Sequence, residues 1–254
     1  MFTNAIVRTP GRSIVEGLSD SKTLGLPNYE QAIIQHQSYI DVLTKCGLDV
    51  LVLEPCEEYP DSTFVEDVAL ITPNCVIITR PGAPSRRGEV HEIEFVLKQK
   101  FNNIEAIEAP GTIEGGDIMM VGDHYYIGLS ERTNIEGAKQ IIQILTKYGM
   151  SGSTISLKKV LHLKTGLSYL EENNLVVCGE FIKDSSLEGY NRIEIPEKES
   201  YAANCIWVNE SVIIPLGYPT TKQRIKNAGY PVIETDVTEF QKLDGGLSCL
   251  SLRY

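Results

Sequence analysis

The sequence predicts a mixed α/β fold in which five similar units form a ring with approximate fivefold symmetry, as in a propeller or barrel. Three observations predict it. A short apolar run, a few polar turn residues and a second apolar run recur five times along the chain. Helical patterns and a further extended run follow most of these repeats. The last repeat ends after one strand, and the first residues of the chain supply an unpaired apolar strand of the same kind.

Each repeated stretch has the pattern of a β-hairpin or of part of one. The stretches are "DVALITPNCVII" from Asp67, "DIMMVGDHYYIG" from Asp117, "LSYLEENNLVVCG" from Leu167, "NCIWVNESVIIPLG" from Asn204 and "LSCLSLRY" from Leu247. Their starts lie 50, 50, 37 and 43 residues apart, so one supersecondary unit recurs with connections of variable length. For the fifth stretch we expect "FTNAIVRTP" at the N-terminus to complete the unit, so that the two ends of the chain meet.

The segments between the hairpins predict a helix and a third strand. Helical periodicity covers residues 28–47, 87–100, 134–149 and 220–229, and three of these runs end on a glycine, which favours a helix C-terminus. Extended apolar runs cover residues 48–55, 104–110 and 230–236. The unit is therefore strand, strand, helix, strand. Only residues 181–200 are expected to form a long irregular surface segment.

A ring of such units pairs or covers its own strand edges, as a propeller or barrel does. We therefore expect one domain, residues 1–254, with no internal linker. The length is sufficient for a sizeable core. Because no apolar run approaches the length of a membrane span and the N-terminus has no signal-peptide pattern, a cytoplasmic protein is expected.

Composition excludes several classes of function. The net charge of −11 argues against nucleic acid or an anionic membrane surface as a partner, because both select basic patches. A small cationic ligand is compatible with this charge. The six cysteines are scattered without CxxC spacing or clustered histidines, so neither a metal site nor a disulfide framework is expected.

The repeat gives scattered polar residues a common position, because equivalent residues of a ring converge on the same end of its axis. The residues at or just before successive inner strands are Glu66, Asp67, Glu114, Asp117, His162, Thr165, Asn204, Ser248 and Cys249. Each also has a structural interpretation: an aspartate can form a turn, a histidine can simply pack, and a buried cysteine can be inert. Their shared register favours a site that combines carboxylates, an imidazole and a thiol.

Two glycine pairs stand beside these residues. "EGGD" covers residues 114–117 and "DGGLSC" covers residues 244–249. Glycine pairs are typical of tight turns and of places where a ligand or another chain segment approaches the backbone closely. A plain turn is the alternative for each pair.

Several motifs resemble one family along essentially the whole chain, from "RTPGRS" to Tyr254. They are "FVEDVAL", "SRRGE", "EAPGTIEGGDIMMVGDHYYIG", "ERTN", "VLHLKTGLSYLEENNL", "SYAANCIWVN" and "DGGLSCLSLRY". They are similar to the bacterial dimethylarginine dimethylaminohydrolases, members of the guanidine-modifying α/β propellers called penteins. The resemblance implies a five-bladed propeller and hydrolysis of Nω-methylated L-arginine to L-citrulline and a methylamine, without a cofactor. The arginine deiminases of the same superfamily are longer, with an inserted helical domain.

The resemblance also implies roles for individual residues. Cys249 would be the nucleophile that forms a covalent S-alkylthiouronium, His162 the acid and base, and Glu114 the partner of His162. Asp67 would bind the guanidinium, and Glu66 would also contact the substrate. The remaining implied contacts are Arg86 and Arg132 to the substrate carboxylate, Asp61 and the Leu18 carbonyl to its ammonium group, and the Leu243 carbonyl near the guanidinium.

Alternatives remain open at this stage. A related hydrolase that acts on arginine, monomethylarginine or citrulline would use the same cysteine and histidine. Small differences such as Val68 and Gly116 leave the methylation preference open. A non-catalytic pentein that serves as a binding module, like translation initiation factor 6, is disfavoured by the joint presence of Cys249, His162 and Glu114. The family also suggests a homodimer.

Overall fold

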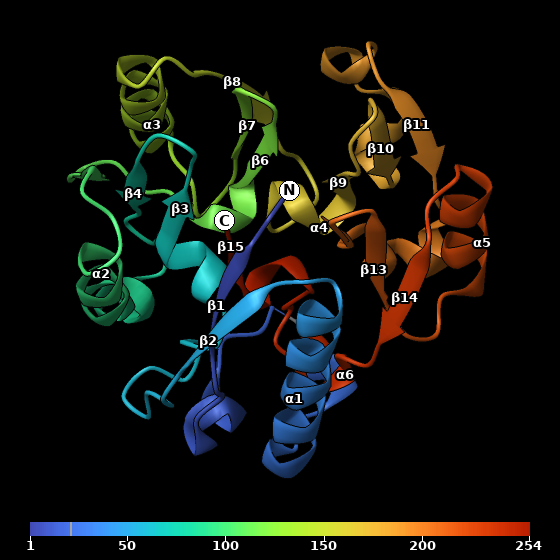
Figure 1. Cartoon of the computed structure of the whole chain (residues 1–254), viewed down its shortest axis with the longest axis horizontal. Helices are drawn as coiled ribbons and strands as arrows, with labels where there is room; N and C mark the ends of the chain where they lie inside the picture. Colours follow the sequence, from blue (N-terminus) through green and yellow to red (C-terminus); the bar gives the residue numbers. More distant parts are fainter. Residues whose placement is uncertain (21) are drawn as a thin grey trace.

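A computed structural model of the chain describes residues 1–20 and 22–254, and within them five three-stranded sheets surround a common centre (Figure 1). In chain order the sheets contain β3 (Ala69–Ile71), β4 (Val76–Ile78) and β5 (Ile104–Ala106); β6 (Ile118–Val121), β7 (His124–Leu129) and β8 (Ser151–Ser156); β9 (Leu167–Tyr169), β10 (Asn174–Val177) and β11 (Asn191–Glu194); β12 (Ile206–Val208), β13 (Ser211–Pro215) and β14 (Val232–Thr235); and β15 (Leu252–Arg253), β1 (Asn4–Arg8) and β2 (Asp49–Leu53). The predicted ring of five units is confirmed.

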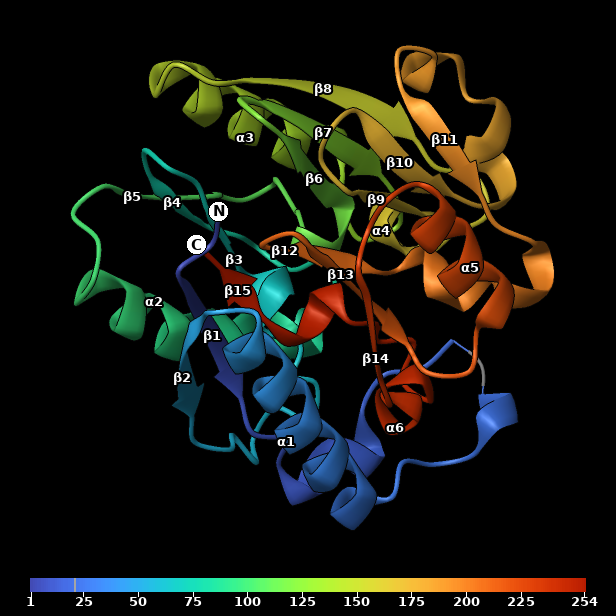
Figure 2. The same cartoon turned by 45° about the vertical axis from the view of Figure 1, so that its right-hand side comes forward.

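All five sheets share one topology. The middle strand pairs antiparallel with the strand before it and parallel with the strand after it, as β7 does with β6 and β8. In the fifth sheet, β1 takes the middle position between β15 and β2, with Ile6 opposite Leu252 on one side and Leu51 on the other. The chain ends therefore complete the last unit, as predicted, and Figures 1 and 2 both show the two termini close together.

Helices connect the middle and third strands in four of these units and lie on the outer rim of the ring (Figure 1). They are α1 (Tyr29–Lys45), α2 (Val90–Lys98), α3 (Ile135–Lys147) and α5 (Pro219–Asn227). The side chains of Asn28 and Asn134 accept hydrogen bonds from backbone N–H groups in the first turns of α1 and α3. After α1 the chain turns through Gly47, whose positive φ of 89° favours glycine.

The hydrophobic cores lie between neighbouring units rather than within them. In one core, Ile77 of β4 packs with Ile127 of β7 and with Ile141 of α3, so that it joins two sheets under one helix. The middle strands are covered on both faces, and β1, β4, β10 and β13 are almost entirely buried. Burial on both faces explains why these strands are continuous apolar runs without alternation.

The unit of β9, β10 and β11 departs from the predicted pattern. In place of a rim helix it has two short 3₁₀ helices, η6 (Gly179–Lys183) and η7 (Ser185–Leu187). The expectation of an irregular surface segment at residues 181–200 is therefore wrong. This segment contains β11, and Phe181 and Leu187 are buried in a core with β9 and β10.

Short helical turns precede the first strand of every unit and meet at the centre of the ring (Figure 1). They are η3 (Val65–Val68), η5 (Gly115–Asp117), α4 (Leu163–Gly166), η8 (Glu197–Ala203) and η9 (Ser248–Leu250). The turn η3 contacts both η5 and η9, and α4 contacts η5 and η8. The remaining short helices are η1 (Arg12–Glu16), η2 (Lys22–Leu24), η4 (Pro84–Glu89) and α6 (Thr238–Gln241).

None of the helices in the described part of the chain combines the length and the apolar character needed to span a bilayer.

A matched pair of substitutions tests how strongly ring closure depends on burial of β1. Val7 is fully buried, and its register partner Val52 in β2 is 44% exposed. We expect Val7→Ala to lower the free energy of unfolding by about 1 to 3 kcal/mol through lost contacts and a residual cavity. Urea unfolding measures this loss, and Val52→Ala is the control with the same chemical change. If the two variants lost equal free energies of unfolding, burial of β1 would not be what stabilises ring closure.

Candidate active site

One pocket at the centre of the ring gathers most of the residues that the sequence singled out. Its lining includes nine of the predicted site residues, namely Leu18, Asp61, Asp67, Arg86, Glu114, Arg132, His162, Leu243 and Cys249. We call it the central pocket. The short turns carry the reacting groups: Asp67 lies in η3, Cys249 lies in η9, Glu114 comes just before η5 and His162 just before α4.

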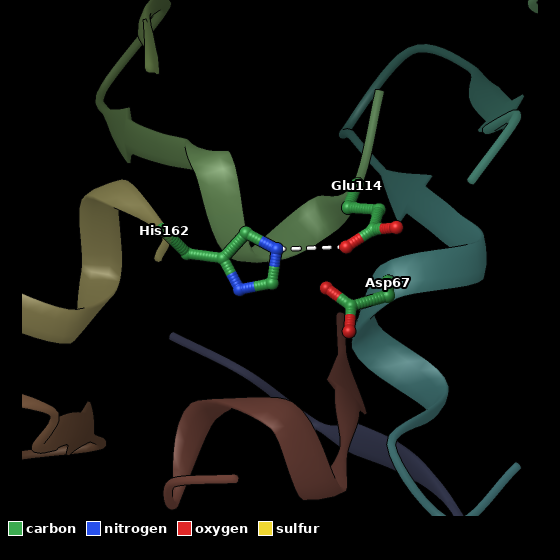
Figure 3. A group of neighbouring side chains, drawn as sticks. All are labelled: Asp67, Glu114 and His162. Atoms are coloured by element: carbon green, nitrogen blue, oxygen red, sulfur yellow. Dashed lines mark hydrogen bonds and ion pairs between the residues drawn. The ribbon is translucent and has the colours of Figure 1, made fainter. Parts of the chain in front are cut away.

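His162 and Glu114 form a buried pair (Figure 3). The imidazole Nε2 lies 2.7 Å from Oε2 of Glu114, and only 11% of the His162 side chain is exposed. Burial disfavours the imidazolium, but the hydrogen bond to Glu114 and the nearby charges of Asp67 and Asp117 outweigh it and raise the pKa of His162 to about 9. The second ring nitrogen, Nδ1, is not used by this hydrogen bond.

Glu114 is itself held in place. Its other carboxylate oxygen accepts a hydrogen bond from the backbone N–H of Ala83 at 3.2 Å, and the backbone N–H of Glu114 donates to Thr133 Oγ1. The residue is 1% exposed. The carboxylate can therefore fix the orientation of the imidazole ring, as the acidic member of a catalytic triad does.

Asp67 is a fully enclosed carboxylate beside this pair (Figure 3). Arg86 donates to one of its oxygens at 2.6 Å, and the backbone N–H of Gly116 donates to the other at 2.9 Å. Burial acts to raise the pKa of Asp67, but the charges of Arg86 and His162 prevail and hold this pKa below its usual value. Asp67 is therefore a stable negative charge inside the pocket.

Gly116 permits this arrangement. A Cβ atom at this position would lie 2.8 Å from Nδ1 of His162 and 3.1 Å from Oδ1 of Asp67. Any side chain would therefore displace the imidazole or the carboxylate. The second glycine of "EGGD" therefore permits a close approach between chain segments, in addition to forming a turn.

The three side chains in Figure 3 form a site that favours binding of a positively charged group. Asp67, Glu114 and His162 each offer a ligand atom, and these atoms all lie within 4.8 Å of one another. A metal ion would have to compete with Arg86 for Asp67 and with the hydrogen bond between His162 and Glu114. A guanidinium group can instead donate hydrogen bonds to carboxylates without displacing these contacts.

Cys249 lies in η9, where the backbone N–H of Gly246 donates to its sulfur at 3.4 Å. Burial, together with the charges of Asp67 and Glu66, raises the pKa of the Cys249 thiol to about 12, although the Gly246 N–H and Lys164 act in the opposite direction. Without a ligand the thiol is therefore protonated at neutral pH. A cation bound beside it would favour the thiolate.

The two candidate arginines have different environments. The guanidinium of Arg86 is buried, and it donates to Asp67, to both carboxylate oxygens of Glu89 and to the backbone carbonyls of Asp61 and Phe64. Within residues 1–20 and 22–254, no carboxylate forms an ion pair with Arg132, which also lines the pocket. Arg132 is therefore the arginine that is available to a ligand carboxylate.

Two loops form the rim of the central pocket. Asp61 accepts a hydrogen bond from the backbone N–H of Leu18 at 2.9 Å, and this contact holds the loop that follows η1. The backbone N–H of Asp20 donates to the Asp244 carboxylate at 2.6 Å and ties that loop to the segment that contains Leu243. Leu18 itself is 38% exposed.

Glu66 does not line the central pocket. Its carboxylate accepts hydrogen bonds from Lys164 at 2.5 Å and from Ser248 at 2.8 Å, and it faces a second cavity on the other side of the turns. The sequence-based expectation of a substrate contact from this side chain is not supported by this geometry. Consecutive residues such as Glu66 and Asp67 point to opposite sides of their turn.

Sequence reasoning missed several residues that shape the pocket. Glu89 holds Arg86, and its i, i+3 spacing from Arg86 in "SRRGE" was an available signal. Phe64, Leu161, Asp244 and Gly245 also line the pocket. Asp244 and Gly245 belong to the "DGGLSC" pattern, whereas no local pattern marks Phe64 and Leu161, which reach the pocket only when the units close into a ring.

Comparisons with known proteins identify close relatives. The family profile described as "N,N dimethylarginine dimethylhydrolase, eukaryotic" matches residues 26–251. The N(G),N(G)-dimethylarginine dimethylaminohydrolase of Pseudomonas aeruginosa is 58% identical over 255 residues, which cover 100% of each chain.

Two solved structures match the fold. One is the C249S mutant of the enzyme from P. aeruginosa complexed with citrulline, and the other is a dimethylarginine dimethylaminohydrolase H162G adduct with S-methyl-L-thiocitrulline. Each has a TM-score of 0.98 and 58% identity, and each alignment covers 100% of both chains.

The pair of His162 and Glu114 gives a prediction about titration. We expect the imidazole of His162 to titrate near pH 9 in the wild type. In Glu114→Gln the pKa should fall, because the neutral amide no longer stabilises the imidazolium. Nuclear magnetic resonance of the imidazole protons measures both values. An unchanged pKa in the variant would contradict the assigned pairing.

Proposed function

Because this chain belongs to the N,N dimethylarginine dimethylhydrolase family, we propose that it hydrolyses Nω-methylated L-arginine, both asymmetric dimethylarginine and monomethylarginine, to L-citrulline and dimethylamine or methylamine. The observation that carries the proposal is the convergence of Cys249, the His162–Glu114 pair and Asp67 in one pocket. The relative that is 58% identical supports the same reaction by its name.

The charges of the pocket suit the guanidinium end of the substrate. Asp67 is buried and ionised, and it lies beside the sulfur of Cys249 closely enough to raise the pKa of the thiol. The bound guanidinium neutralises part of this negative charge. The substrate therefore promotes ionisation of the thiol that attacks it, so that the thiolate forms when its target is in place.

Cys249 then acts as the nucleophile. Its thiolate attacks the guanidinium carbon, and the C–N bond to the methylated nitrogen breaks to leave an S-alkylthiouronium on the sulfur. Water attacks this intermediate, the C–S bond breaks, and citrulline is released. The P. aeruginosa relative supports this role, because its complex with citrulline contains a mutation at a position that also bears the number 249.

His162 supplies and removes the protons. Its pKa of about 9 makes it an imidazolium at neutral pH, so that it can protonate the departing amine. The resulting neutral imidazole then accepts a proton from the attacking water. Glu114 orients the ring and stabilises its charged form. The relative that bears an H162G mutation gives an adduct with S-methyl-L-thiocitrulline, which agrees with a role for this histidine in completing the reaction.

The amino-acid end of the substrate lies toward the rim. We assign its carboxylate to Arg132, because Arg86 is already engaged with Asp67 and Glu89. Arg86 instead holds Asp67 in place and is a positioning residue. The carboxylate of Asp61 and the Leu18 carbonyl face the substrate ammonium group, and the Leu243 carbonyl accepts from the guanidinium.

Three further features belong to the proposal. Residues 1–254 constitute one catalytic domain that acts without a cofactor. The protein works in the cytoplasm on a small-molecule substrate, without a nucleic-acid or membrane partner. It forms a homodimer, as the family suggests.

The proposed nucleophile has a direct test. Cys249→Ser should leave a folded protein whose production of citrulline from asymmetric dimethylarginine falls by orders of magnitude, because a hydroxyl is a far weaker nucleophile at neutral pH. Cys205→Ser is the matched control, since Cys205 is also a buried free thiol. A colour assay for citrulline under reducing conditions measures both variants. Near-normal turnover by Cys249→Ser would refute the covalent mechanism.

The same assay separates the proposed reaction from its nearest rival. Wild-type protein is incubated with dimethylarginine, monomethylarginine, arginine and citrulline in parallel. Preference for the methylated substrates supports the proposal, whereas preference for arginine or citrulline assigns the chain to a related hydrolase. If no compound is turned over, the chain is a binding module.

The assignment of the two arginines predicts different kinetic effects. Arg132→Ala should raise KM for dimethylarginine, corresponding to a loss of about 2 to 5 kcal/mol of binding. It should leave the already slow turnover of a decarboxylated analogue almost unchanged. Arg86→Ala should lower turnover of both compounds, because Asp67 loses its partner. Steady-state kinetics on both compounds measures these effects, and equal losses on the two compounds in Arg132→Ala would contradict its contact with the carboxylate.

A further inference from the structure

A network of buried polar side chains lies directly behind the proposed nucleophile. It consists of Lys164, Glu66, Ser248 and Asn204, which come from the turns of four different units. We call it the rear network. Its members Glu66, Lys164 and Ser248 line the second cavity, which lies on the opposite side of the turns from the central pocket. The proposed reaction chemistry uses none of these side chains directly.

Ser248 is the residue where the contacts of the network meet. Its hydroxyl donates to Glu66 Oε2 at 2.8 Å and accepts from Asn204 Nδ2 at 3.1 Å. Its backbone N–H donates to Asn204 Oδ1 at 2.9 Å. Three hydrogen bonds from two other units therefore hold one residue of η9, and that residue is 2% exposed.

The same residue is bonded directly to Cys249 in the chain. The hydroxyl oxygen of Ser248 lies 4.0 Å from the sulfur of Cys249, and both residues belong to the single turn of η9. Asn204 also packs against Gly246 on the other side of this turn, where a Cβ atom would approach the asparagine side chain to 2.5 Å. Asn204 and Ser248 thus determine the path of the backbone that carries the sulfur.

We propose that Ser248 is a positioning residue for the nucleophile, and that the rear network fixes η9 so that the sulfur of Cys249 faces the guanidinium carbon. This inference rests on the proposed function of Cys249. A nucleophile on a short turn near the end of the chain needs such support, because small displacements of a reacting atom reduce the rate strongly.

The network also balances charge behind the sulfur. The carboxylate of Glu66 disfavours the thiolate of Cys249, and the ammonium group of Lys164 favours it. The ion pair between Lys164 and Glu66 therefore places a positive charge beside the carboxylate and offsets part of its opposition to ionisation of the thiol. Loss of Lys164 should raise the pKa of the thiol further, and loss of Ser248 should mainly disturb its position.

The experiment compares Ser248→Ala with Ser248→Thr in the full-length protein. We expect Ser248→Ala to lower kcat for dimethylarginine about 10- to 100-fold with little change in KM, because the sulfur is misplaced while the substrate contacts remain. Ser248→Thr keeps the hydroxyl that bonds Glu66 and Asn204 and should therefore recover most of kcat. The matched control is Ser251→Ala, which removes another buried hydroxyl, bonded to Tyr39, from the same end of the chain.

Two outcomes would overturn the inference. One is a Ser248→Ala variant with wild-type kcat, and the other is an equal loss of kcat in Ser251→Ala. If the first outcome is accompanied by a change in thermal stability, Ser248 is a structural residue only.

A second measurement does not depend on turnover. Mass spectrometry follows the rate at which iodoacetamide alkylates the Cys249 peptide as a function of pH. Alkylation requires the thiolate. In Lys164→Met the rise of the alkylation rate with pH should therefore occur about one pH unit higher than in the wild type, and Lys164→Arg should restore the wild-type profile. An unchanged profile in Lys164→Met would overturn the charge-balancing role. If wild-type protein makes no citrulline, the proposed reaction fails, and this profile still tests the network by itself.

Discussion

Closure of the ring by the pairing of β1 with β15 is the constraint on which the site depends. Cys249 lies three residues before β15, so the pairing of Leu252 with Ile6 determines where the thiol lies. The turn that carries it is held on one side by this pairing and on the other by η3 and η5. Without closure the chain end would be free to fray. Residues 245–252 are instead all buried.

The charges of the central pocket follow from this enclosure. Carboxylates that would be ordinary on the surface become strong local charges when several are buried around one space. Arg86 keeps Asp67 ionised, and Glu114 keeps His162 protonated. Burial, together with the negative charges of Asp67 and Glu66, holds the Cys249 thiol neutral. The pocket is thus prepared for a cation, and arrival of that cation changes the protonation of the thiol.

The short turns divide neighbouring residues between two sides of the ring. Asp67 and Cys249 face the central pocket, while Glu66 and Ser248 face the second cavity. Each pair of adjacent residues therefore contributes one side chain to the chemistry that we propose and one to the support behind it. A mutation at either member of such a pair disturbs the same turn, so kinetic and titration measurements are needed to separate the two roles.

The sequence by itself determined the architecture and most of the pocket lining. Five repeats of the same apolar pattern predicted five units and the pairing of the chain ends, because strand patterns are local and ring closure is the way to cover their edges. The family resemblance assigned roles to residues such as Cys249 and His162. Only the tertiary structure decided which side of a turn Glu66 faces and which arginine remains available. Those features depend on partners far away in the chain, as Lys164 is from Glu66, and no local pattern encodes such contacts. The same reason explains why residues 181–200 resembled a loop, since their burial depends on packing against β9 and β10.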